Sequence, residues 1–516
     1  MDILLGILVA SAAGLMGFLW FKGAFIPLGK PTRTVNDTLN PAHSYYIEEE
    51  PGKQLFSCSF IEFDDRGDFL LAEQLRHAQD TVKTLAKSEQ PLVLIYFAHG
   101  WRNSSQSGNV PGFFGFLRQV ANTELAKQQN WRVHGVYLGW RGAIFKPVYP
   151  DAASFNTPYD QNLIDRLNCS SPCPGITQKL ETALYWTDKR LPEYYISGTS
   201  LSLAVHSLAQ TAKRHNEHGK NKVFLIGHSF GGLLTERTFM NSTLAELENQ
   251  LAKLETLKPG ETVQFNPLSF DTVLLLNSAS PSIYAKQFQD YLIAYGHAMV
   301  NVLGNAANRP VFISLTSKGD TATGVAHPAA NFLTSFSTTL RRKYDGNRDS
   351  ILVNRDLTRL NDGQIEVPQS VYYDKTPGHN PLLVNRWIEP VKQAKIPEAE
   401  IRANLQTYSP FEQNVRSNML AKDENYFFTS NAAGSNNDVW VVRFPGDKLS
   451  EENKAWSVWK NFLPFCWFEK HSAYWIIRCP AEIIKDHNDI WNQRAMETYA
   501  AFFALVEPGE DPDVGD

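Results

Sequence analysis

One serine of the sequence stands where a nucleophile is expected. Ser229 is the centre of a Gly-x-Ser-x-Gly pattern between Gly227 and Gly231. The apolar run 222–226 precedes the pattern, and the run 233–237 after it has the composition of a helix. A sharp strand-to-helix turn of this kind exposes the serine hydroxyl above the edge of a sheet, and its glycines allow the helix to pack closely on the strand. The pattern therefore predicts a nucleophile elbow, and the structural alternative is a Gly-rich turn that contains serine by chance.

A serine hydroxyl is a weak nucleophile at neutral pH, so it needs a base, and the base needs an orienting acid. In a parallel sheet these groups come from loops at the carboxyl ends of the strands. Asp320 follows the apolar run 311–316 by a few residues, which makes it the expected acid. Asp290, in the connection before that run, is the second choice, and a surface Gly-Asp turn is the alternative interpretation of Asp320.

The base is sought among the histidines that follow the acid, which are His327, His379, His471 and His487. His471 precedes the apolar run 473–478 and so belongs to the opposite edge of the sheet. His487 follows that run and is expected to open a helix that runs through Phe503. We therefore predict His487 as the base, with His379 in reserve, and a solvated helix-capping histidine is the alternative.

Acyl transfer also needs hydrogen-bond donors for a developing oxyanion. The backbone N–H of Phe230, next to the nucleophile, is one expected donor. The second is expected from the loop after an earlier strand, where Gly100 lets the backbone turn inward. The Trp101 amide is the preferred donor there, with that of Gly100 next.

These groups need a scaffold, and the hydrophobic pattern predicts one. Apolar runs typical of buried strands alternate with segments of helical periodicity. An order of strand, helix, strand, helix indicates an α/β fold with a mostly parallel sheet that is covered by helices on both faces. The expected strands are 57–63, 91–97, 133–138, 222–226, 271–277, 311–316 and 473–478. The expected helices are 68–85, 113–128, 199–217 and one after Ser229.

The domain organisation follows from composition and spacing. Long stretches without a strand are rarely structureless, so the one before 473 is expected to form a cap or lid with its own elements. The predicted segments are a transmembrane anchor 1–22, a linker 23–55, a core 56–320 with an insertion 143–197, a cap or lid 321–470, the end of the core 471–506 and a disordered acidic tail 507–516.

The N-terminus is expected to anchor the chain in a membrane. The run Ile3–Phe21 holds about 19 almost uninterrupted apolar residues, which as a helix span about 28 Å. A cleaved signal peptide is the alternative, but Asp2 and the lack of an early Lys or Arg argue against it. Lys22 and the basic residues that follow it favour a cytoplasmic catalytic domain by the positive-inside rule.

Composition excludes some functions. The chain has 516 residues and a net charge of −5, without a basic region interleaved with aromatics, so nucleic acid is not an expected partner. The five cysteines form no zinc-binding pattern. The cysteines are Cys58, Cys169, Cys173, Cys466 and Cys479.

Taken together, Phe97-Ala98-His99-Gly100-Trp101, Gly227–Gly231, Gly319-Asp320 and His487 resemble the α/β-hydrolase superfamily, most closely its lipases and esterases. The resemblance covers about 90–320 and 470–505, while the N-terminal segment and the long insertion depart from a minimal member. It implies an acyl-enzyme on Ser229 and carboxylic esters, lipids among them, as substrates, without a cofactor. An acyltransferase or thioesterase, and a non-catalytic scaffold of the same fold, remain alternatives. The sequence does not indicate the acyl chain, the head group or the oligomeric state.

Overall fold

The computed structural model describes most of the predicted core. The described residues are 2–22, 30–35, 43–50, 53–105, 108–142, 176, 179, 196–215, 220–255, 268–280, 284–285, 288, 310–323, 350–354, 364–368, 386–392, 425–430, 438–443 and 474–505.

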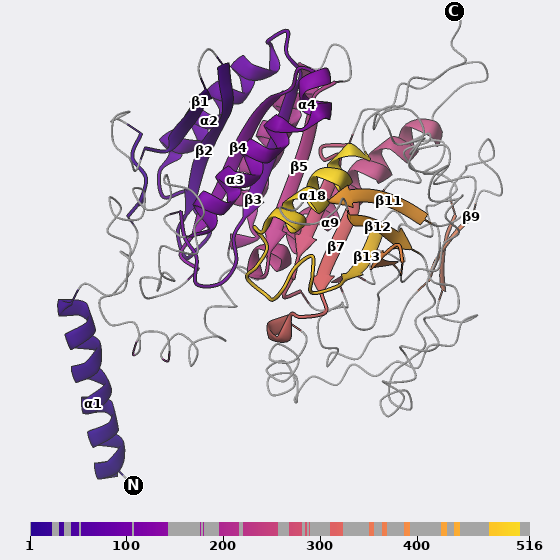
Figure 1. Ribbon diagram of the computed structural model, residues 1–516. Coiled ribbons are helices and arrows are strands. Elements are labelled where there is room, and N and C mark those ends of the chain that lie inside the picture. Colours follow the sequence, from indigo (N-terminus) through magenta and orange to yellow (C-terminus); the bar gives the residue numbers. More distant parts are fainter. Residues whose placement is uncertain are drawn as a thin grey trace, which may run out of the picture.

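An 11-stranded sheet runs through the molecule in the order β1-β2-β4-β3-β5-β6-β7-β13-β10-β12-β11 (Figure 1). Neighbouring strands from β2 to β10 are parallel, while β1 at one edge and β12 and β11 at the other pair antiparallel. The expected α/β class with a mostly parallel sheet is thus confirmed. The strands are β1 Tyr45–Glu50, β2 Lys53–Phe63, β3 Leu92–Ala98, β4 Arg132–Trp140, β5 Lys222–His228, β6 Thr272–Leu276, β7 Phe312–Ser317, β10 Arg386–Pro390, β11 Asn425–Ser430, β12 Asp438–Arg443 and β13 Tyr474–Cys479.

Helices cover both faces of the sheet, and they sort into two layers by the core to which they contribute. One core contains α2 Ala72–Ala86, α8 Thr199–Arg214 and α9 Phe230–Glu255. The other contains α3 Asn109–Asn122 and α18 Gln493–Ala504, which Figure 1 shows side by side on the near face of the sheet. Successive residues of a strand point to opposite faces, so Leu94 packs in the first core and Ile95 in the second. Burial on both faces explains why the central strands are continuous apolar runs.

The predicted helix 113–128 is two helices. It divides into α3 and α4 Glu124–Gln128 at Thr123, whose backbone is extended. The hydroxyl of Thr123 accepts a hydrogen bond from the N–H of Ala126 at 3.1 Å, which caps the second helix.

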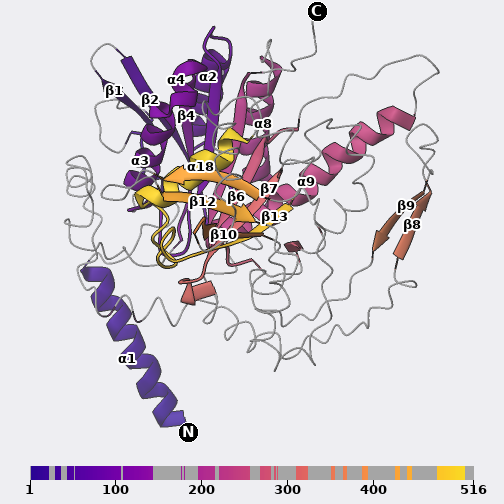
Figure 2. The same cartoon turned by 45° about the vertical axis from the view of Figure 1, so that its right-hand side comes forward.

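The segment predicted as a cap contributes strands to the large sheet. β10, β12 and β11 extend that sheet beyond β13, so this part of 321–470 continues the core instead of covering it. A separate two-stranded sheet of β8 Ser350–Asn354 and β9 Gln364–Pro368 also comes from this segment, and Figure 2 shows it away from the large sheet. The insertion 143–197 and the acidic tail 507–516 fall almost wholly outside the described residues.

The N-terminal run forms a helix, α1 Asp2–Phe21. Among the residues that the structure describes, however, no helix is both long enough and apolar enough to span a bilayer. The helical part of the prediction is confirmed, whereas the membrane-spanning role gains no support.

A short segment after α1 is fastened to the core. The buried carboxylate of Glu62, in β2, accepts hydrogen bonds from the backbone N–H groups of Thr32 (3.0 Å) and Arg33 (2.9 Å). The buried guanidinium of Arg33 donates to the carbonyl of Ser105 from Nε (3.0 Å) and Nη2 (2.6 Å), and it stacks on the ring of Phe60. The chain before β1 is therefore linked to the loop that follows β3.

Candidate active site

The predicted elbow is present between β5 and α9. Ser229 has φ 54°, a left-handed conformation that is strained for a serine, and it is 5% exposed. Its N–H donates to the carbonyl of Leu276 at 3.0 Å, and its carbonyl accepts from the N–H of Ala279 at 3.1 Å. These bonds to the end of β6 hold the strained turn in place.

Close backbone packing explains the two glycines of the motif. A Cβ at Gly231 would lie 2.0 Å from the carbonyl oxygen of Ala98, and one at Gly227 would lie 2.6 Å from the carbonyl oxygen of Gly231. Neither position has room for a side chain. The first turn of α9 therefore lies directly against the end of β3.

The three predicted side chains form one hydrogen-bonded chain. The hydroxyl of Ser229 donates to Nε2 of His487 at 2.9 Å, and Nδ1–H of His487 donates to Oδ2 of Asp320 at 3.0 Å. They come from the loops after β5, β13 and β7, so strand ends bring together residues that are up to 258 positions apart. This arrangement can take a proton from the serine and orient the imidazole that receives it.

Asp320 is buried, and its carboxylate has several donors. Oδ1 accepts from the N–H groups of Ala322 (2.9 Å) and Thr323 (3.0 Å), while Oδ2 also accepts from the hydroxyl of Thr323. Burial raises the pKa of this carboxyl, but the hydrogen bond and charge of His487 together with the Thr323 bonds outweigh it, so the pKa is below its ordinary value. The acid is thus held in its ionised form.

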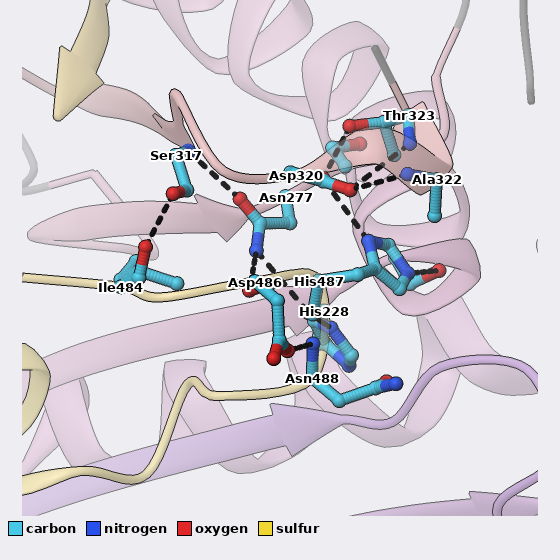
Figure 3. A network of polar contacts seen from close by, with 12 residues as sticks. His228, Asn277, Ser317, Asp320, Ala322, Thr323, Ile484, Asp486, His487 and Asn488 are labelled. Atoms are coloured by element: carbon cyan, nitrogen blue, oxygen red, sulfur yellow. Dashed lines mark hydrogen bonds and ion pairs between the residues drawn. The ribbon is translucent and has the colours of Figure 1, made fainter. Parts of the chain in front are cut away.

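Two side chains fix the backbone of the histidine loop (Figure 3). The carbonyl of His487 accepts from Nε2–H of His228 at 2.9 Å and from Nδ2 of Asn277 at 3.1 Å. Burial, followed by the neighbouring His487, lowers the pKa of His228 to about 3, so this ring is neutral. His228 is the last residue of β5, and Asn277 comes directly after β6. Their hydrogen bonds therefore attach the loop that carries His487 to the ends of two strands.

Asn277 also connects the acid loop to the histidine loop. Its Oδ1 accepts from the N–H of Ser317 at 3.0 Å, and its φ is 42°. The hydroxyl of Ser317 donates in turn to the carbonyl of Ile484, as Figure 3 shows. Asn277 therefore lies between the two loops that carry Asp320 and His487.

The predicted oxyanion residues border Ser229. A Cβ at Gly100 would lie 2.8 Å from Cβ of Ser229, so the loop after β3 passes directly over the serine. The rings of Trp101 and Phe230 have centroids 6.2 Å apart, which places the two preferred donors on adjoining segments.

The position of His487 differs from the expectation in one respect. It does not open a helix, because α18 begins at Gln493, where the side chain of Asn492 accepts from the N–H of Ala495 at 3.0 Å and caps the helix. His487 lies instead in the preceding loop. The alternatives Asp290, His327, His379 and His471 lie outside the described residues.

Two residues of the site were not found from the sequence. His228 is the variable position of the elbow motif, and Asn277 directly follows β6, the strand next to β5. The rule that selected Asp320, a polar residue after a buried strand, also applies to Asn277 and was the available signal. Among the described residues, no group of three or more His, Cys, Asp or Glu side chains is arranged to hold a metal ion, and Cys58 and Cys479 are free and buried.

No family model, no curated protein and no solved structure matches this chain.

Proposed function

We propose that the protein is a serine hydrolase that cleaves carboxylic esters through an acyl-enzyme on Ser229. The observation that carries the proposal is the hydrogen-bonded chain from Ser229 through His487 to the buried, ionised Asp320. A strained serine conformation at the tip of the elbow supports it, because such strain concentrates at functional sites.

The chemistry follows from the geometry. Oγ of Ser229 attacks the ester carbonyl carbon while its proton passes to Nε2 of His487, and the carbonyl oxygen becomes an oxyanion. When the tetrahedral intermediate collapses, His487 gives this proton to the leaving alkoxide, and an alcohol departs. Water then attacks the acyl-enzyme with His487 again as base, which releases the carboxylic acid and restores the serine.

The proposal includes membership of the α/β-hydrolase superfamily. The support is the strand–elbow–helix at Ser229, the chain order Ser, Asp, His, and a loop after β3 that passes over the nucleophile. In this fold the oxyanion donors are the N–H of Phe230 and that of Trp101 or Gly100. Lipids are included among the proposed ester substrates.

The test is covalent labelling of the full chain with a fluorophosphonate probe, together with hydrolysis of p-nitrophenyl butyrate. Wild type should label and hydrolyse, and Ser229→Ala should lose labelling and about 10⁶ in kcat. Ser57→Ala is a matched control, because the hydroxyl of Ser57 also contacts a buried imidazole, Nδ1 of His134 at 2.8 Å, outside the site. The control should label like wild type. Equal labelling of wild type and Ser229→Ala, or no reaction of either, contradicts the proposal.

A further inference from the structure

His99 directly follows β3 and carries a buried imidazole at the start of the loop that passes over Ser229. The ring is 0% exposed and stacks on Trp140 of β4 with centroids 3.8 Å apart. Because β3 lies between β4 and β5, the ring is on the side of β3 away from the nucleophile. His99 therefore does not contact the reacting atoms directly.

Both ring nitrogens of His99 have backbone partners, and these fix its tautomer. Nε2 lies 3.0 Å from the backbone N of Trp140, which can only donate, so Nε2 accepts. Nδ1 lies 2.9 Å from the carbonyl oxygen of Gly100, which can only accept, so Nδ1 carries the proton. Burial lowers the pKa of His99 to about 4, which keeps the ring neutral and preserves this pair of roles.

The bond to Gly100 fixes the orientation of a peptide group. In a trans peptide the C=O and the N–H point in opposite directions, so a carbonyl of Gly100 held toward His99 turns the N–H of Trp101 away from it. β5 lies on the opposite side of β3 from β4 and His99, and Ser229 directly follows β5. The N–H of Trp101 therefore points toward the side of Ser229. The same peptide begins at Gly100, where an added Cβ would lie 2.8 Å from Cβ of Ser229.

We propose that His99 is a positioning residue: by donating from Nδ1 to the carbonyl of Gly100, it aims the N–H of Trp101 at the oxyanion that forms on Ser229. This inference rests on the proposed function. It selects the Trp101 N–H over the Gly100 N–H as the second oxyanion donor. It also means that His99 affects the rate of the reaction, which a residue that only packs in the core would not do.

Two substitutions separate the donor from the ring. His99→Phe keeps a flat ring against Trp140 but has no donor, whereas His99→Asn loses the ring and keeps an N–H group near the place of Nδ1. With p-nitrophenyl butyrate as substrate, His99→Phe should lower kcat by about 10²- to 10³-fold, the usual effect of losing one oxyanion donor, with KM changed less than threefold. The kcat of His99→Asn should be at least tenfold higher than that of His99→Phe. A trifluoromethyl ketone forms an adduct with Ser229 that mimics the tetrahedral intermediate. Across these variants its binding affinity should fall in parallel with kcat.

The matched control is His134→Phe, which removes another histidine that is 0% exposed but lies in β4, where its ring contacts the hydroxyls of Ser57 and Ser59 of β2. It should lower stability and leave kcat within threefold of wild type. If His99→Phe falls no further in kcat than this control, or if His99→Asn is no more active than His99→Phe, His99 acts only in packing and the inference is wrong.

A measurement on the wild-type protein does not depend on the variants. In ¹⁵N NMR of histidine-labelled full-length protein, the imidazole signal that is absent from His99→Phe should show the proton on Nδ1 and a bare Nε2 between pH 6 and 8. A proton on Nε2 would overturn the inference even if no variant folds. Failure of the proposed function is distinguishable, because wild type would then not react with the fluorophosphonate at Ser229 at all.

Discussion

Asp320 shows how a buried carboxylate is stabilised by its neighbours. An isolated carboxylate pays a large desolvation cost on burial, and most such groups take up a proton instead. Here two backbone N–H groups, one hydroxyl and the imidazole of His487 donate to its two oxygens. The lowered pKa means that the charge opposite His487 is present throughout the neutral pH range.

Substitution Asp320→Asn keeps the shape of this group and removes its charge. The amide would present a donor or a weak acceptor to Nδ1 of His487, and so would disturb the tautomer that leaves Nε2 free to accept from Ser229. We expect kcat toward p-nitrophenyl butyrate to fall by about 10⁴-fold with a small change in KM. A fall of less than tenfold in steady-state kinetics would mean that Asp320 does not orient the base.

Glu236 is a second buried carboxyl with the opposite behaviour. It lies in α9, is 0% exposed, and accepts a hydrogen bond from the hydroxyl of Tyr474 at 2.7 Å. Burial is the largest influence on this carboxyl and outweighs the hydrogen bonds from Ser280 and Tyr474, so its pKa rises from 4.5 to about 7. The folded protein therefore holds a proton here that the unfolded chain releases above pH 4.5.

This difference predicts a pH dependence of stability. Because the folded state binds the extra proton between pH 4.5 and about 7, the free energy of unfolding should decrease as pH rises through that window and then level off. The decrease due to Glu236 should be about 3 kcal/mol. Glu236→Gln should lack this decrease. In urea unfolding, the free energy of unfolding of the variant relative to wild type should therefore be higher at pH 8 than at pH 5. Parallel stability curves for the two proteins would show that the carboxyl is not protonated in the fold.

At the scale of elements, the elbow depends on how closely α9 approaches β3. Gly231 is in the first turn of α9, where a methyl group would meet the carbonyl oxygens of Ala98 (2.0 Å) and His99 (2.5 Å). Relief of that overlap requires the helix to move from the strand end, and Ser229 moves with the helix.

Gly231→Ala should therefore destabilise the protein by about 2–4 kcal/mol and reduce kcat by more than tenfold. Gly115→Ala is the matched control in α3, where an added Cβ meets nothing within 4 Å. It should be stabilising by about 0.5–1 kcal/mol, because alanine is the better helix former. The measurement is urea unfolding with parallel ester kinetics, and similar behaviour of the two variants would contradict the close packing.

The hydrophobic pattern of the sequence predicted the strands of the site well and the ends of the helices less well. The strands that carry Ser229 and Asp320 were predictable because burial on both faces makes a continuous apolar run, and the chain order then fixes which ends lie together. The break at Thr123 was missed because helical periodicity continues across it, although Thr is a common N-cap. His487 was assigned to a helix for a similar reason, since the cap at Asn492 is visible only from its hydrogen bond.

At the scale of the whole molecule, the extension of the sheet by β10, β12 and β11 was not predictable from the sequence. These strands are short, and β10 pairs with β13, which comes later in the chain, so no local signal shows the pairing. The buried charges of Arg33 and Glu62 were equally hidden, because a charged residue in a sequence reads as exposed until its partners are known.

Arg33 joins the segment after α1 to the loop after β3, so its loss should lower the stability of the whole molecule. The variant Arg33→Met would leave the carbonyl of Ser105 without its two donated hydrogen bonds and the ring of Phe60 without the guanidinium that stacks on it. We expect a loss of about 2–4 kcal/mol in stability by urea unfolding. The control is Arg494→Ala, whose pair with Asp438 at 2.8 Å is partly exposed and should contribute less than about 1 kcal/mol. Equal losses would mean that the segment after α1 is not held by the core.

The pairing of β7 with β13 has a consequence for how such a chain can change. Phe312 lies opposite Tyr474 and Ser317 opposite Cys479, so the spacing between the proposed acid and base is set across two adjacent strands. It does not depend on the length of chain that leads from one strand to the other. The connections from β7 to β10 and from β12 to β13 can thus be shortened, lengthened or exchanged in evolution or by a protein engineer, with new substrate preferences installed there, while the paired strands keep the reacting groups aligned.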